Sequence, residues 1–425
     1  MSPISKLREQ SFLVYGLGSS GKSVIKFFKK NNIKKYKVWD DKQKKLFKKR
    51  RAKNLKETLN TVDYIVLSPG ISFLKKKFLI KFKKKIITDI DFFYLTNKNL
   101  KSIVVTGTNG KSTTCKLISN LLKKNKFKVL LGGNIGTPIL DLNIKEKTFV
   151  VIEASSFQLS HSKFIKPDFA FLLNITNDHL DWHGNMLNYT NSKLKIFMSQ
   201  ETNQFALVNI KLKRIFKKNN FASKLIIPKT KNYTKIKHRI KNYYLKSNIN
   251  DENMSFVYAL SKLLKISTKN FINTANSFIG LSHRYEIFLK KKNITFINDS
   301  KATSFESTKY ALSNSKNIYW ILGGLPKKND KISITETRKN IIKCYLIGKN
   351  INFFKEQIKN KVNYTISINL KKALIQILKD IKSFNTKDSI ILFSPAAASY
   401  DQFINFEKRG DEFKKLSQFY AKKFI

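Results

Sequence analysis

The stretch that decides the fold is SIVVTGTNGKST, residues 102–113. Its first four residues, 102–105, are mostly apolar and β-branched, which predicts a short buried strand. A glycine-containing turn follows, and a helical pattern then runs from Lys111 to about Lys124. A strand, a glycine turn and a helix N-terminus in this order place backbone N–H groups where they can hold phosphates. The sequence therefore predicts a phosphate-binding loop inside a parallel α/β unit.

This loop departs at one position from the usual P-loop pattern. Five residues before Gly110 the chain has Val105, where that pattern has glycine. A plain glycine-containing turn is the alternative, but Gly-Lys-Ser-Thr after a predicted strand favours phosphate binding, with Lys111 on the terminal phosphates and a hydroxyl on Mg²⁺. The loop residues expected to contact the nucleotide are Gly107, Thr108, Asn109, Gly110, Lys111, Ser112 and Thr113.

Strand and helix signals alternate along the rest of the chain, which predicts parallel sheets. The runs expected to form strands are 11–15, 37–39, 64–67, 102–105, 149–152, 169–173, 294–297, 318–322, 345–347 and 390–393. Residues 203–246 are rich in Lys and Asn and weakly patterned, and a helix at 253–264 is expected to close the middle domain. Because 425 residues are too many for one core, we expect three α/β domains.

Polar motifs begin where two of the predicted strands end. EASSFQL, residues 153–159, follows one strand, and NITNDHLD, residues 174–181, follows the next. In open α/β sheets, ligands gather at the carboxyl ends of the strands. Taken alone, Glu153 or His179 is more often structural, but their joint placement favours a site for Mg²⁺ beside the phosphate loop.

Composition argues against several classes of protein. Hydrophobic residues make up 42% of the chain, enough to bury cores, so global disorder is not expected. No run of about 18 apolar residues is present, which argues against a membrane span, and residues 1–10 lack the features of a signal peptide. The two cysteines, Cys115 and Cys344, have no metal-ligand spacing, and a reducing cytoplasm fits best.

The formal net charge of +55 has two explanations. A positive electrostatic potential over the whole protein surface attracts phosphate backbones and would suit a nucleic-acid-binding protein. Only eight of the 83 basic residues are arginine, however, although base-reading proteins favour the arginine fork. Lysines also lie in all segments, together with many Asn, Ile and Phe residues, as adenine- and thymine-rich codons would produce. Compositional drift is the favoured explanation, and no specific nucleic-acid partner is expected.

The motifs together resemble those of a known family. The blocks that resemble the central domain of the Mur ligases are 106–113, 132–136 (GGNIG), 153–159 and 174–181. The blocks that resemble the branch of that family using D-glutamate are 280–286 (GLSHRYE), 298–303 (NDSKAT) and 394–411 (SPAAASYDQFINFEKRGD). The blocks occur in the family's order from Gly16 to Asp411, so the resemblance covers nearly the whole chain.

The resemblance implies an ATP-dependent ligase of bacterial peptidoglycan synthesis with three domains. Residues 1–97 would bind the uridine nucleotide of UDP-N-acetylmuramoyl-L-alanine, residues 98–280 would bind ATP and metal, and residues 281–425 would bind D-glutamate. The implied fold is a Rossmann-like first domain, a central P-loop ATPase-type domain and a Rossmann-like C-terminal domain. The implied reaction uses ATP and Mg²⁺ to activate a carboxylate as an acyl phosphate, in a cytoplasmic enzyme expected to be a monomer.

The family's catalytic and metal-binding positions match residues of the central blocks. The implied catalytic residues are Lys111, Glu153, His179 and Lys193, and the implied metal ligands are Ser112, Glu153, His179 and Lys193. Lys193 aligns with a lysine that the family carbamylates, which would turn its amine into a metal-binding carboxylate. From composition alone Lys193 is one solvated lysine among many, and a small gap in the alignment would exchange it with Lys195.

The family's substrate positions carry over in the same way. For the uridine substrate they are Gly18, Ser19, Ser20, Asp40, Asp41, Lys42, Ser68, Pro69, Gly70, Asn134 and His179. Further positions for ATP are Asn250, Asn253, Arg284 and Asp299, although Ile249 replaces the family's histidine. For D-glutamate they are Lys301, Thr303, Lys327, Ser399 and Phe406, although GGLPK at 323–327 departs from the usual Gly-Gly-Asp-Gly-Lys. Lys301 has a structural alternative as a salt-bridge partner of Asp299.

Three alternatives stay open. The chain is compatible with a Mur ligase for another amino acid or with folylpolyglutamate synthase, although the latter lacks the nucleotide-binding first domain that residues 16–70 predict. A basic, nucleic-acid-binding P-loop protein is a second alternative, which the scarcity of arginine disfavours. A ligase that has lost activity is the third, given Ile249 and Leu325-Pro326. The residues that argue for activity are Lys111, Glu153, His179 and Lys193.

Overall fold

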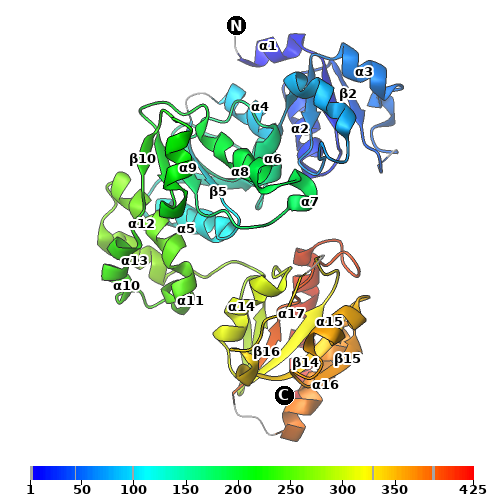
Figure 1. Ribbon diagram of the computed structural model, residues 1–425, viewed down its shortest axis with the longest axis vertical. Coiled ribbons are helices and arrows are strands. Elements are labelled where there is room, and N and C mark those ends of the chain that lie inside the picture. Colours follow the sequence, from blue (N-terminus) through cyan, green and yellow to red (C-terminus); the bar gives the residue numbers. More distant parts are fainter. Residues whose placement is uncertain (1–2, 44, 98–99, 328–329, 385–387) are drawn as a thin grey trace. The chain divides into compact units, whose positions relative to one another are not determined.

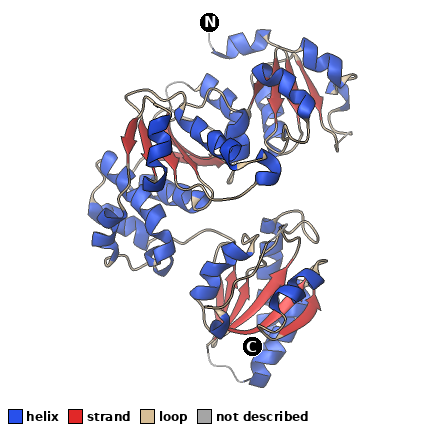
Figure 2. Ribbon diagram, in the orientation of Figure 1, coloured by secondary structure: helices blue, strands red, loops and turns tan. Residues whose placement is uncertain are grey.

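The computed structural model describes residues 3–43, 45–97, 100–327, 330–384 and 388–425. Three β-sheets organise these residues (Figure 1), and Figure 2 shows helices lying against the strands of each sheet. The chain packs as two compact units, Met1–Phe278 with two of the sheets and Ile279–Ile425 with the third. The expected α/β class with three sheet-based domains is confirmed. The proposed domain bounds at 97/98 and 280/281 remain predictions.

The first sheet has four parallel strands in the order β2-β1-β3-β4. The strands are β1 Phe12–Tyr15, β2 Tyr36–Trp39, β3 Tyr64–Leu67 and β4 Ile86–Ile87, and the helices are α1 Pro3–Glu9, α2 Ser19–Lys30, α3 Leu55–Thr61 and α4 Asp89–Thr96. Phe12 packs on one face, against Phe28 of α2 and Phe92 of α4, whereas Leu13 packs on the other face. This sheet is therefore buried on both faces, as parallel sheets usually are.

The central sheet has six parallel strands in the order β10-β9-β8-β5-β7-β6. Their bounds are β5 Lys101–Thr106, β6 Lys128–Gly133, β7 Thr148–Glu153, β8 Phe169–Leu172, β9 Phe205–Val208 and β10 Lys224–Ile226. β5, which leads into the phosphate loop, lies between β7 and β8. The segments that follow these three neighbouring strands therefore meet at one edge of the sheet, where α/β proteins bind their ligands.

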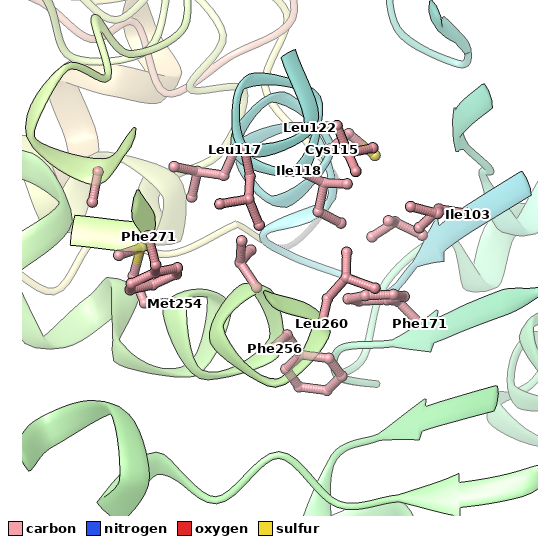
Figure 3. Close-up of a cluster of buried hydrophobic side chains, with 14 of the residues drawn as sticks. Ile103, Cys115, Leu117, Ile118, Leu122, Phe171, Met254, Phe256, Leu260 and Phe271 are labelled. Carbon is pink, nitrogen blue, oxygen red and sulfur yellow. The ribbon is translucent and has the colours of Figure 1, made fainter. Parts of the chain in front are cut away.

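Helices cover the central sheet and close its core. They are α5 Lys111–Lys124, α6 Ser156–His161, α7 Leu180–His183, α8 Met186–Leu194, α9 Lys213–Lys218, α10 Thr230–Lys237, α11 Tyr243–Lys246, α12 Asp251–Leu263 and α13 Thr268–Asn276. Figure 3 shows Leu117 and Ile118 of α5 facing Leu260 of α12, with Phe171 of the sheet beside them. Each such buried side chain stabilises the fold by about 1.5–3 kcal/mol.

The structure adds elements to this region and corrects one expectation. Residues 203–246, which look weakly patterned, contain two strands and three α-helices, because short amphipathic segments lie among surface lysines and asparagines. α12 does not close this part of the chain. α13 follows it, and Phe271 of α13 joins the same core cluster as α5.

The third sheet has six strands in the order β11-β12-β16-β13-β14-β15, all parallel except the edge strand β11. The strands are β11 Glu286–Lys291, β12 Ile294–Asn298, β13 Ile318–Gly323, β14 Ile341–Ile347, β15 Tyr364–Ile368 and β16 Ser389–Phe393, and the helices are α14 Phe305–Ser313, α15 Ile351–Ile358, α16 Leu370–Phe384 and α17 Phe406–Phe424. Separate apolar clusters fill the two faces of the sheet. Across the described ranges, no helix has both the length and the apolar character that a membrane crossing needs.

Candidate active site

The phosphate loop closes at Gly110, the residue before α5. Gly110 has φ of 84° and ψ of −13°, a left-handed conformation that favours glycine. A Cβ at this position would lie 2.2 Å from Oδ1 of Asn253, so a side chain fits only if Asn253 moves. Asn253 lies in the first turn of α12. The close approach therefore places Asn253, one of the residues expected to contact ATP, beside the phosphate loop.

The two asparagines expected to contact ATP, Asn250 and Asn253, lie together. Asn253 Nδ2 donates to Asn250 Oδ1 at 3.3 Å, and Asn250 Nδ2 donates to the Tyr244 carbonyl at 2.8 Å. Both side chains are buried, so this pair is held firmly at the start of α12. The side chain of Ile249, which replaces the family's histidine, lies outside the described part of the structure.

A hydrogen-bond network fixes the rest of the phosphate loop. The Thr108 N–H donates to the Asn174 carbonyl at 2.9 Å, and the Asn109 N–H donates to Asn174 Oδ1 at 2.8 Å. Lys111 Nζ folds back over the loop and donates to the carbonyls of Gly107 and Thr108, both at 2.8 Å. The ammonium group therefore lies over the backbone that would cradle phosphates, and it can exchange these carbonyls for phosphate oxygens.

Lys193, on α8, reaches the same loop. Its side chain is only 1% exposed, and Nζ donates to the Gly107 carbonyl at 2.9 Å. Burial, followed by the charge of nearby Lys111, holds the pKa of Lys193 well below its ordinary value. Burial therefore favours the neutral amine, which is the nucleophilic form that adds to CO₂.

Lys195, two residues further on, points elsewhere. Its Nζ donates to the carbonyls of Ser160 and Ser162, at 2.6 and 3.3 Å, around the end of α6. Burial also lowers the pKa of Lys195, to about 8. Of these two lysines, the structure thus brings Lys193 to the phosphate loop and keeps Lys195 at the far end of α6.

Glu153, the last residue of β7, is a buried carboxylate with one satisfied oxygen. Its side chain is 1% exposed, and Oε1 accepts a hydrogen bond from Asn134 Nδ2 at 2.7 Å. Oε2 is buried and has no hydrogen-bond partner among the described residues. An unpaired buried carboxylate oxygen is costly, and each one calls for an explanation such as a bound ion.

His179 stands immediately before α7 in a left-handed conformation, with φ of 55°. The centroids of its ring and the Phe157 ring are 4.6 Å apart, and Nε2 lies 3.4 Å from Oδ2 of Asp178. The imidazole is about two-fifths exposed. The ring therefore packs against Phe157, with Nε2 beside the Asp178 carboxylate.

The expected metal ligands fit Mg²⁺ by their chemistry. Glu153 offers the unpaired Oε2, and the Ser112 hydroxyl is buried in the first turn of α5. Within the described ranges, no three His, Cys, Asp or Glu side chains gather closely enough to hold a metal ion by themselves. A hard cation would need a further oxygen ligand, and a carbamate on Lys193 would supply it.

In the first sheet, Asp40 organises the glycine turn after β1. Its Oδ2 accepts from the Leu17 N–H at 2.7 Å, and Oδ1 accepts from the N–H groups of Lys42 and Gln43 at 2.9 and 2.8 Å. Although burial opposes the effect, these hydrogen bonds hold the pKa of Asp40 below its ordinary value. Asp40 therefore shapes the expected uridine pocket through the backbone, with both oxygens already engaged.

Asp41 is engaged as well. It accepts hydrogen bonds from the Tyr15 hydroxyl and from Trp39 Nε1, and it pairs with Lys76 Nζ at 2.9 Å. On the other side of β1, the Ser68 hydroxyl donates to the Gly16 carbonyl at 2.8 Å. The segments that follow β1, β2 and β3 thus meet at one edge of the first sheet, as expected for a nucleotide pocket.

In the C-terminal unit, Arg284 and Asp299 lie close together. Ser394 Oγ donates to Asp299 Oδ2 at 2.6 Å, and the Tyr285 N–H donates to Oδ1 at 3.1 Å. Burial raises the pKa of Asp299 to about 7, although the charge of Arg284 counteracts it. Arg284 Nε is buried without a hydrogen-bond partner among the described residues, so this guanidinium is a candidate anion ligand.

The residues expected to bind D-glutamate lie on loops at one end of the third sheet, except Phe406, which is the first residue of α17. Lys301 Nζ lies over the Phe406 ring, 5.1 Å from its centroid. Ser399 is buried, Thr303 is half-buried and Lys327 is exposed. An isolated β-bridge joins the loop of Lys327 to that of Ser399. A cation and small hydroxyl residues at strand ends suit a substrate that carries carboxylates.

Known proteins match the chain along its whole length. The family model described as the Mur ligase middle domain matches residues 105–277. The chain is 35% identical to the UDP-N-acetylmuramoylalanine--D-glutamate ligase of Wolbachia sp. subsp. Brugia malayi, over 97% of each chain. It is 36% identical to the protein of the same name from Rickettsia prowazekii, over 97% of this chain and 98% of that one. The chain belongs to the Mur ligase family.

Solved Mur ligase structures share the fold. A MurF ligase from Thermotoga maritima in complex with ADP superimposes with a TM-score of 0.58 at 16% identity, covering 99% of this chain and 97% of that one. A MurF structure from Acinetobacter baumannii gives a TM-score of 0.57 at 15% identity, covering 79% of each chain. At such identities the likeness shows the fold alone, which is the three-domain Mur ligase fold with a central ATPase domain.

Sequence reasoning missed two residues that support the site of this Mur ligase. Asn174 accepts hydrogen bonds from two N–H groups of the loop. The Tyr189 hydroxyl lies 2.9 Å from the Thr108 hydroxyl, and the centroid of the Tyr189 ring lies 4.6 Å from Lys193 Nζ. Asn174 opens the motif that contains His179, so its place after a strand was a usable signal. Tyr189 precedes Lys193 by four residues, and that spacing puts both on one face of a helix.

Proposed function

We propose that this Mur ligase joins the amine of D-glutamate to the alanyl carboxylate of UDP-N-acetylmuramoyl-L-alanine, converting ATP to ADP and phosphate. The full-length relatives support this activity, because their names state the D-glutamate reaction and the alignments cover 96–97% of this chain. The central domain supports the use of ATP, because it combines a phosphate loop with metal-ligand candidates, of which Ser112, Glu153 and Lys193 are buried.

The observation that carries the proposal is the buried amine of Lys193, 2.9 Å from the Gly107 carbonyl. A neutral amine adds to CO₂ and loses one proton, which leaves a carbamate with two oxygens and one negative charge. The charge of Lys111 would stabilise that anion. Together with the unpaired Oε2 of Glu153, the carbamate would complete a set of hard oxygen ligands.

The residues that would hold Mg²⁺ are Ser112, Glu153, His179 and carbamylated Lys193. The ion, when bound, supplies charge neutralisation for the phosphates of ATP. The alanyl carboxylate attacks the γ-phosphorus, ADP leaves, and the amine of D-glutamate then attacks the acyl carbon and releases phosphate. Lys111 and the loop N–H groups orient the phosphates, so the protein contributes mainly positioning and charge stabilisation.

We assign each substrate to the residues expected from the sequence. Residues 1–97 bind the uridine substrate, 98–280 bind ATP, and 281–425 bind D-glutamate. Because both oxygens of Asp40 are committed to backbone N–H groups, its role in the uridine site is to shape the pocket. Monomeric state and cytoplasmic location remain predictions from the sequence.

Phosphate release tests the proposed substrate. The assay supplies ATP, Mg²⁺ and UDP-N-acetylmuramoyl-L-alanine, and adds D-glutamate, L-glutamate, L-alanine or meso-diaminopimelate in turn. We expect D-glutamate to give the fastest release, because Lys301 and Thr303 offer a cation and a hydroxyl for a small dicarboxylic acid. Fastest release with meso-diaminopimelate would show that the chain serves another step of the family.

A further inference from the structure

Two adjacent residues of the first-domain segment after Gly70 contact the central domain. The Ile71 carbonyl lies 3.1 Å from His161 Nε2, and the Ser72 hydroxyl donates to the Trp182 carbonyl at 2.7 Å. Ser72 and His161 are 2% and 4% exposed, so both hydrogen bonds are shielded from water. Burial lowers the pKa of His161 to about 4, and the neutral ring can donate from Nε2 to the carbonyl. These contacts lie directly beside the proposed uridine loop, 68–70.

The two contacted helices carry metal-ligand candidates at their other ends. α6, Ser156–His161, starts three residues after Glu153 and ends at His161. α7, Leu180–His183, starts immediately after His179 and includes Trp182. Both helices are less than two turns long, so a displacement at one end reaches the other end with little loss. Residues 71–73 thus contact the C-terminal ends of α6 and α7. Glu153 and His179 lie next to the N-terminal ends of the same two helices.

Ring contacts join the two helices to each other and to the same segment. Phe73 packs on His161 at 4.5 Å between centroids, and His161 packs on Trp182 at 5.5 Å. Phe157 of α6 contacts both Trp182 and His179, at 4.9 and 4.6 Å. Close-packed side chains respond to a shift as a unit. The hydrogen bonds and the rings therefore form one connected cluster between the uridine loop and the metal-ligand candidates.

We propose that Ser72 and His161 are positioning residues that couple occupation of the uridine loop to the placement of Glu153 and His179. The inference rests on the proposed function, because it takes loop 68–70 as the site of the uridine nucleotide. When the nucleotide orders this loop, residues 71–73 hold α6 and α7 in the arrangement that presents both ligands. Binding of the carrier nucleotide thereby prepares the catalytic centre before the alanyl carboxylate arrives.

Hydrogen exchange read by mass spectrometry tests this coupling without metal or turnover. The probe is UDP, which lacks the alanyl carboxylate and so cannot reach the centre directly, added to the full chain in a metal chelator. In the wild type, we expect UDP to slow exchange about threefold or more in residues 68–73 and also in 156–161 and 180–183. In Ser72→Ala, protection of 68–73 should persist while protection of 180–183 is lost.

His161→Phe is the second variant, because it keeps a ring between Phe73 and Trp182 and removes only the hydrogen bond to Ile71. It should lose the protection of 156–161. Ser261→Ala is the matched control, because the buried Ser261 hydroxyl also donates to a backbone carbonyl, that of Tyr258 at 2.7 Å within α12. This control should behave as the wild type.

Three results would count against the coupling, and they separate it from the proposed function. Unchanged protection of both helices in Ser72→Ala and His161→Phe would overturn the coupling alone. Protection of 68–73 without any effect on the helices of the wild type would also overturn it and leave the uridine site standing. Absence of protection at 68–73 in the wild type would overturn the coupling and the proposed uridine site together.

Discussion

Lys193→Ala should lower turnover by a factor on the order of a thousand while the protein stays folded. The substitution removes the amine that forms the carbamate, and with it the oxygen ligands proposed to complete the metal site with Glu153. Folding should survive, because the lost polar contacts are one hydrogen bond from Nζ to the Gly107 carbonyl and the approach of Nζ to the Tyr189 ring. Steady-state phosphate release gives the turnover, and circular dichroism with thermal unfolding gives the state of the fold.

Two controls sharpen this test. Lys195→Ala should keep far more activity than Lys193→Ala, because Lys195 Nζ reaches the carbonyls of Ser160 and Ser162 and not the phosphate loop. A short carboxylic acid at high concentration should partly restore Lys193→Ala by replacing the missing oxygens. Wild-type turnover in Lys193→Ala together with an inactive Lys195→Ala would reverse the two assignments.

Glu153→Gln should lower turnover by a factor on the order of a hundred to a thousand and raise the Mg²⁺ concentration needed for half-maximal activity. Glutamine keeps the shape, and its Oε1 can still accept from Asn134. Its amide nitrogen, however, replaces the unpaired Oε2 with a neutral donor that repels a cation. Phosphate release measured over a range of Mg²⁺ concentrations provides both values.

Asp168→Asn is the matched control for Glu153→Gln. Asp168 precedes β8, at the opposite edge of the same sheet, and its Oδ2 accepts from the Ser102 N–H at 2.8 Å. This variant should keep the Mg²⁺ dependence of the wild type, whatever it costs in stability. If Glu153→Gln and Asp168→Asn change the Mg²⁺ dependence equally, the metal role of Glu153 is wrong.

Local sequence signals predicted the centre of each sheet better than its edges. The helix expected at 111–124 is α5, Lys111–Lys124, because a glycine turn and an amphipathic pattern define both of its ends. The two-residue strand β4 and the antiparallel edge strand β11 were not predicted. Whether such a segment forms a strand depends mainly on the neighbouring strand it pairs with. The residue pattern of the segment itself does not contain that information.

The candidate site shows the same division. Glu153 was predicted because it ends an apolar strand, whereas nothing in the composition distinguishes Lys193 from the other lysines. What sets Lys193 apart is tertiary: α8 buries its amine against the Gly107 carbonyl. The contacts of Asp40 with the Leu17 N–H and of Asp41 with Tyr15 and Lys76 were equally invisible, because these partners are distant in the sequence.

Tracing one oxygen atom tests the central claim, that the chain activates its substrate as an acyl phosphate. The alanyl carboxylate of UDP-N-acetylmuramoyl-L-alanine is labelled with heavy oxygen, and the products of a reaction with ATP and D-glutamate are analysed by mass spectrometry. The γ-phosphoryl route moves one carboxylate oxygen to phosphorus, so the account predicts label in inorganic phosphate, with ADP as the nucleotide product. Label in AMP, with pyrophosphate released, would contradict it.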